Sequence, residues 1–178
     1  MRKMSYVKMS IMTAVCIALC VVLPMAFHAI PGAAFSILPM HIPVLLCGLI
    51  LGWRFGLMAG IAGPLVSSLI TGMPPSFVLP GMLVELGAYG LIAGLLMQLL
   101  NTKKIFLDLY ISLAASMLIG RVIAGVTQAL IFSSGNYSMA AWTAVYFINS
   151  FPGMLIQLAF LPSLVIALES SRLIPGKY

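Results

Sequence analysis

One cation of this 178-residue sequence lies inside an apolar run that is long enough to cross a bilayer. Arg121 is flanked by Leu118-Ile119-Gly120 and by Val122-Ile123-Ala124. A cation at the centre of a membrane costs about 2.5 kcal/mol or more, so it is retained beside a partner or an aqueous cavity. Arg121 is therefore the first candidate for binding a solute.

Two further polar residues can be placed at the depth of Arg121. On helices that rise about 1.5 Å per residue, Arg121 lies about 25 Å and Glu85 about 27 Å from the basic segment Lys103–Lys104. Counted in the same way from Trp142, Asn149 lies about 10 Å below the outer interface. We predict that these three residues form one polar layer, which anchors a solute site open to the outside.

The same residues have a structural interpretation. A Glu85–Arg121 ion pair can serve only to hold two helices together, because intramembrane charges also pair for packing. Tyr89, one turn from Glu85, and Gln128, two turns after Arg121, can line the same cavity. Each of them can equally be an ordinary polar contact between helices.

Residues that support catalysis or metal binding are sparse. The sequence has three acidic residues and contains no HExxH, GxSxG or P-loop motif, so we expect no enzyme activity, no ATP site and no cofactor. Cys16, Cys20 and Cys47 lie in apolar runs without CxxC spacing, which indicates small core residues. His28 and His41 bracket one loop but lack the further ligands of a zinc site, so we expect no metal and interpret both as polar caps at the outer interface.

The amino-acid composition indicates the solvent in which these residues lie. Hydrophobic residues make up 62% of the chain and charged residues only 7%, against about 25% charged in soluble domains. Lipid is the solvent in which such a chain can expose most of its surface. The net charge of +6 is not gathered into a basic stripe with interleaved aromatic residues, which excludes a nucleic-acid partner.

Six apolar segments divide the chain, and we predict an all-α integral membrane protein with a single domain, residues 1–178. The predicted helices are Val7–Phe27, His41–Leu51, Phe55–Ile70, Leu79–Leu100, Phe106–Phe132 and Trp142–Leu168. The second is short for crossing a membrane, so it either packs within the bundle or does not cross fully.

The remaining basic residues define an orientation. With six spans, all of them fall on one side together with both termini, and the loops near residues 29–40, 71–78 and 133–141 carry no Lys or Arg. The residues on the basic side are Arg2, Lys3, Lys8, Arg54, Lys103, Lys104, Arg172 and Lys177. The positive-inside rule therefore predicts that both termini are cytoplasmic.

Small residues four positions apart allow helices to approach closely in lipid. Ala14 and Ala18 form such a face on the first helix, and the pairs Gly56/Gly60 and Gly120/Ala124 fit the same template. These faces can contact either a partner protein or another helix of the same chain.

Several segments, taken in order, resemble the substrate-binding S components of energy-coupling factor (ECF) transporters. They are the Ala14–Ala18 face, PMHIPVLLCG at residues 39–48, GWRFG at residues 52–56 and ELGAYGLIAG at residues 85–94. The resemblance covers the whole chain and includes six helices with cytoplasmic termini.

The resemblance implies a vitamin-uptake subunit in the plasma membrane of a prokaryote. Such a subunit binds a small vitamin near the outer face and associates with a membrane coupling (T) subunit and two cytoplasmic ATPases. Ala14 and Ala18 would then contact the coupling subunit. The sequence is most similar to the pantothenate-type branch, and a pyridoxine-like or thiamine-like substrate remains open, as does a scaffold protein with a structural Glu85–Arg121 pair.

Overall fold

The computed structural model describes residues 4–28, 38–132, 142, 144–148 and 150–177. Its helices are α1 (Tyr6–His28), α3 (His41–Leu51), α4 (Trp53–Thr71), α5 (Leu79–Leu99), α6 (Ile105–Thr127) and α8 (Phe151–Ser170). Two π-helical turns, η1 (Gln128–Phe132) and η2 (Ala144–Ile148), follow α6 and precede α8. No strand occurs in these described ranges. The predicted all-α bundle is confirmed.

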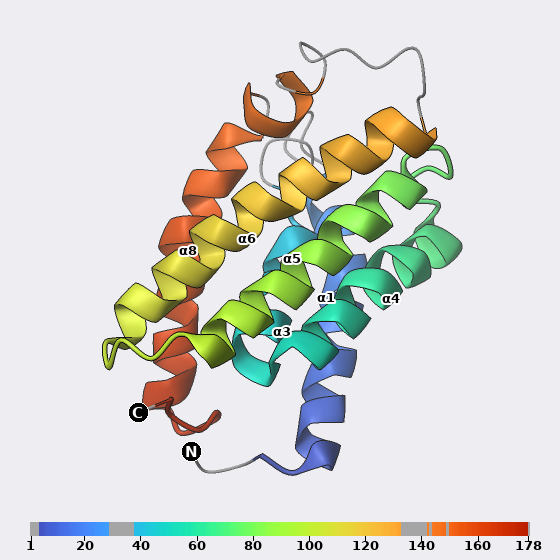
Figure 1. Cartoon of the computed structure of the whole chain (residues 1–178). Helices are drawn as coiled ribbons and strands as arrows, with labels where there is room; N and C mark the ends of the chain where they lie inside the picture. Colours follow the sequence, from blue (N-terminus) through green and yellow to red (C-terminus); the bar gives the residue numbers. More distant parts are fainter. Residues whose placement is uncertain (1–3, 29–37, 133–141, 143, 149, 178) are drawn as a thin grey trace.

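The helices alternate in direction along the bundle. The start of α1, the α3–α4 turn, the α5–α6 turn and the end of α8 all lie at one end (Figure 1). Lys8, Arg54, Lys103, Lys104 and Arg172 belong to these segments. The predicted orientation requires this gathering of basic residues at one end, which we call the cytoplasmic end.

Within the described residues, five helices are long and apolar enough to cross a membrane. The exception is α3, whose 11 residues extend about 16 Å, roughly half of the hydrocarbon core. It lies in the middle of the bundle in Figure 1 and contacts α1, α4, α5, α6 and α8. Because eight of its residues are buried, α3 is an internal helix, one of the two possibilities that its length allowed.

Glycines let the backbones of α4 and α5 pack in direct contact. A Cβ added to Gly56 would lie 2.3 Å from the carbonyl oxygen of Gly90, and one added to Gly90 would lie 2.1 Å from that of Gly56. A Cβ on Gly60 would similarly lie 2.3 Å from the carbonyl oxygen of Leu86. The Gly56/Gly60 face is therefore used inside the bundle, and it fixes the rotation of α5, which carries Glu85 and Tyr89.

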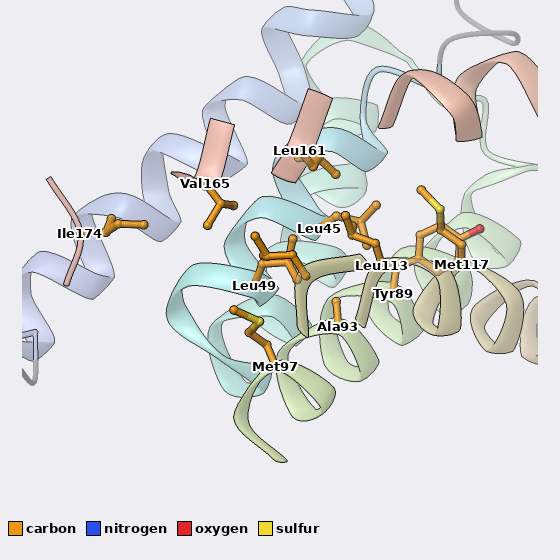
Figure 2. Close-up of a cluster of buried hydrophobic side chains, with 11 residues drawn as sticks. Leu45, Leu49, Tyr89, Ala93, Met97, Leu113, Met117, Leu161, Val165 and Ile174 are labelled. Carbon is orange, nitrogen blue, oxygen red and sulfur yellow. The ribbon is translucent and has the colours of Figure 1, made fainter. Parts of the chain in front are cut away.

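An apolar cluster fills the bundle on the cytoplasmic side of Tyr89. Figure 2 shows Tyr89 and Met117 at one end of this cluster and Ile174 at the other. Its other members are Leu45, Leu49, Ala93, Met97, Leu109, Leu113, Leu161 and Val165. Glu85 and Arg121 thus lie at the Tyr89 end of this cluster, whereas the uncharged Ser112 and Ser116 are buried next to its members Leu113 and Met117 on α6.

Candidate functional site

Arg121 lies on α6 and is 1% exposed, so its guanidinium is held by the bundle and does not face lipid. Its Nε donates a hydrogen bond to the hydroxyl of Tyr89 at 2.8 Å. Its Nη1 contacts the thioether sulfur of Met154 on α8, and its guanidinium carbon lies 5.8 Å from the ring centroid of Phe147. All three partners are neutral, so these contacts hold the cation without neutralising it.

Glu85 lies on α5 and is 8% exposed. Its Oε1 lies 3.5 Å from Nε2 of His41, the first residue of α3. His41 is only 2% exposed and does not cap its helix, so its interpretation as an interfacial polar cap is wrong. His41 is buried because it is the first residue of α3, a helix that packs inside the bundle.

Tyr89 connects the two charged groups. It is fully buried, its hydroxyl accepts the hydrogen bond from Arg121, and its ring meets the ring of His41 edge-on at a centroid distance of 5.3 Å. Among the described residues, no ion pair joins Glu85 to Arg121. We call His41, Glu85, Tyr89 and Arg121 the outer polar layer.

A glycine makes room for this arrangement. A Cβ on Gly120 would lie 2.2 Å from Cδ1 of Tyr89, well inside contact distance. The Gly120/Ala124 pair therefore faces the interior of the bundle, where Ala124 is also fully buried. Its function is to seat Tyr89 between α5 and α6.

The other predicted site residues have different positions. Gln128 begins η1, and its side-chain oxygen would lie 2.9 Å from a Cβ on Gly81, which places it at the outer start of α5. Asn149 is outside the described residues. Trp142, a reference point in the depth argument, donates from its ring nitrogen to the backbone oxygen of Arg121 at 3.4 Å. Sequence reasoning missed the contribution of His41 and Met154, although His41 stood in the segment that carried the resemblance.

Two cavities of about 430 and 370 Å³ lie at the cytoplasmic end, away from the outer polar layer. Both are lined by Met4, Glu169, Ile174, Pro175 and Gly176. Their walls come from the start of α1, from the end of α8 and from the chain that follows it, and the second cavity also reaches α3, α5 and α6. The buried Asp108–Lys177 pair at this end is an ion pair, whereas the described partners of the Arg121 guanidinium are neutral, so we place the candidate site at the outer polar layer on chemistry.

The small-residue face of α1 differs from the other two. Ala14 and Ala18 are exposed, whereas Gly56, Gly60 and Gly120 are buried against neighbouring helices. Apolar neighbours on α1 are also exposed, including Ile11 and Val15. Of the three predicted faces, that of α1 remains open for another protein.

Comparison with known families gives one match. A family model described as "ECF transporter, substrate-specific component" matches residues 8–168. No curated protein matches the chain at a significant level. The match covers every helix of the bundle.

Proposed function

Because the chain belongs to the substrate-specific components of ECF transporters, we propose that it captures a small water-soluble vitamin or vitamin precursor from outside the cell. Arg121 is the proposed anchor for an anionic group of this solute, and pantothenate is the best candidate. The outer polar layer, with Gln128 at the outer start of α5, forms the proposed site, and Asn149 is kept as a member on the sequence argument alone.

The observation that carries this proposal is a buried cation whose described partners are all neutral. A hydroxyl, a thioether and an aromatic ring contact the guanidinium of Arg121, and they engage Nε and Nη1. A buried cation in lipid is costly unless an anion compensates it. A carboxylate on the solute supplies that anion and pairs with Nη2, which favours a pantothenate-like acid over a thiamine-like cation.

The scaffold alternative depended on a structural ion pair between Glu85 and Arg121. The described contacts instead pair Glu85 with His41 and Arg121 with Tyr89. The direct ion pair on which this alternative depended is absent among the described residues, so we do not pursue it.

Delivery of the solute is the second part of the proposal. Ala14 and Ala18 are exposed on α1, where small side chains let a partner helix approach closely. We propose that the membrane coupling subunit binds this face and that two cytoplasmic ATPases supply the energy. Transport would then occur in the plasma membrane of a prokaryote.

The test is calorimetric titration of the purified protein in detergent, without ATP, against a panel of vitamins that includes pantothenate, pyridoxine and thiamine. We expect one member to bind with a Kd in the micromolar range or below. Arg121→Gln should abolish this binding, whereas Arg54→Gln, at the exposed and cytoplasmic Arg54, should leave it unchanged. A folded protein that binds no member of the panel would refute the proposed function.

A further inference from the structure

His41 is a buried polar side chain whose hydrogen-bonding capacity is unused. It is 2% exposed, and neither Nδ1 nor Nε2 has a hydrogen-bond partner among the described residues. The distance of 3.5 Å from Nε2 to Glu85 is that of a loose ion pair. Buried polar groups in proteins are nearly always hydrogen-bonded, and an exception has a specific reason.

Glu85 also has hydrogen-bonding capacity that is unused. A buried carboxylate ordinarily accepts several hydrogen bonds, because its two oxygens offer about four acceptor positions. Within the described part of the chain, His41 is its one ion-pair partner, and the hydroxyl of Tyr89 also interacts with it. The carboxylate retains slight exposure, with 10% of its side chain accessible. It is therefore an acceptor with free positions at the edge of the buried layer.

The outer polar layer thus has two ends with opposite preferences. Tyr89 separates them, since its ring contacts His41 and its hydroxyl accepts from Arg121. The Arg121 end lacks an anion in direct contact, and the Glu85 end has acceptor positions left over beside Tyr89 and His41. A single solute that carries both groups would satisfy both ends together.

We propose that His41 and Glu85 form a donor-recognising pole of the site, and that the substrate is a small carboxylic acid that also bears a hydroxyl, amino or amide N–H group. Glu85 accepts the hydrogen bond from that donor. His41 is a positioning residue, which holds the carboxylate of Glu85 towards the solute. This inference rests on the proposed function and narrows its substrate class.

The first experiment compares four chemical classes of probe by calorimetry on the wild-type protein. Pantothenate and biotin carry a carboxylate and a donor, nicotinate and lipoate a carboxylate alone, pantothenol and pyridoxine donors alone, and thiamine a cation. We expect the tightest binder to belong to the first class. A tightest binder with a carboxylate alone would overturn the inference and leave the proposed function intact. A tightest binder from the donor-only or cationic class would overturn the inference and also the anionic anchor at Arg121, and no binding at all would overturn vitamin capture itself.

The second experiment tests whether Glu85 and His41 form this donor-recognising pole. Glu85→Gln and His41→Phe should each weaken the tightest binder about 10-fold or more, because a buried group loses its partner. His41→Gln, which restores an N–H donor towards Glu85, should recover most of the affinity. The matched controls are Glu169→Gln and His28→Phe, both outside the layer.

The ratio of affinities for an acid and for its neutral analogue distinguishes a specific loss of the Glu85 contact from a general disturbance of the fold. Glu85→Gln and His41→Phe should keep the wild-type preference for pantothenate over pantothenol, or for biotin over biotinamide, because that preference belongs to Arg121. Equal affinities of wild type, Glu85→Gln and His41→Phe for the tightest binder would overturn the inference. Loss of the acid preference in either variant would do the same.

Discussion

Two clusters of buried charge lie at opposite ends of this bundle, and they differ in how completely they are satisfied. At the cytoplasmic end, the carboxylate of Asp108 is fully buried. It accepts hydrogen bonds from the backbone nitrogen and the hydroxyl of Thr102, at 3.3 and 2.7 Å, and it pairs with the ammonium of Lys177. Lys177 also donates to the backbone oxygen of Leu100 at 2.8 Å. We call Thr102, Asp108 and Lys177 the cytoplasmic cluster.

The outer polar layer shows the opposite arrangement. Among the described residues, its cation has neutral partners, its carboxylate has only Tyr89 and a loose ion pair with His41, and its histidine has no hydrogen bond. The cytoplasmic cluster ties the chain after α8 to the start of α6, and each of its charges has an opposite charge in contact. The comparison teaches that buried charge alone does not indicate a site. A buried charge that lacks some of its hydrogen-bond or ion-pair partners does indicate a site, because a solute can supply the missing groups.

The largest effect on stability should come from the cytoplasmic cluster. Asp108→Ala leaves the buried ammonium of Lys177 without its anion, which should cost about 3–5 kcal/mol of stability. Thermal unfolding in detergent measures this loss. The protein that remains folded should bind the solute with wild-type affinity, and a parallel loss of affinity would contradict the division between the two clusters.

Arg121→Met should have the opposite effect, a loss of solute binding without a loss of stability. Removing a cation whose partners are neutral should leave the unfolding temperature unchanged or higher. Solute affinity should fall about 100-fold or more, since a buried charge partner of the ligand is lost. Unfolding and calorimetry on the same preparation test both statements, and a marked drop in unfolding temperature would indicate a structural role for Arg121.

Gly120→Ala should disturb the outer polar layer through Tyr89. The added methyl group would lie 2.2 Å from Cδ1 of the ring, so Tyr89 must shift, at a cost of about 1–3 kcal/mol. Affinity should fall with stability, because Tyr89 holds the Nε of Arg121. The control is Gly87→Ala, where the new methyl would have ordinary contacts at 3.6 Å and should change neither quantity. Equal behaviour of the two variants would refute this role of Gly120.

Substitution of the exposed face on α1 should have the smallest effect on the isolated protein. Ala14→Trp and Ala18→Trp should change stability by less than about 0.5 kcal/mol and leave solute affinity unaltered, because both positions are exposed. Copurification of the coupling subunit from native membranes should be lost. Ala114→Trp, at an exposed position of α6, is the matched control and should retain the partner. Retention of the partner by all three variants would exclude this face as the interface.

The sequence predicted the helices closely because their signals are local. His41–Leu51 was predicted with the bounds that the structure shows, and the other helices begin or end within a few residues of the predicted positions, apart from the last. That helix was predicted over Trp142–Leu168, with local bends or breaks at Pro152 and Pro162, whereas the structure has the π-turn η2 before α8 begins at Phe151. Apolar run length and turn residues report where a helix stops, but they do not report a change of helical pitch inside an apolar run.

The contacts within the site could be predicted only in part. Depth counting brought Arg121 and Glu85 into one layer, because a helix rises by a constant amount per residue. It could not give the rotation of each helix about its axis. That rotation places Tyr89 between the two charges, turns Met154 towards the guanidinium and brings His41 to Glu85.

The amino-acid sequence by itself determined that this is a membrane protein, where its helices lie, which end carries the basic residues and that Arg121 and Glu85 lie within the membrane. These properties follow from residue type and distance along the chain. Tertiary structure decided which polar groups meet. The reason is steric: glycines on α4, α5 and α6 let backbones and one tyrosine ring approach closely, and this packing sets the faces that the buried charges share.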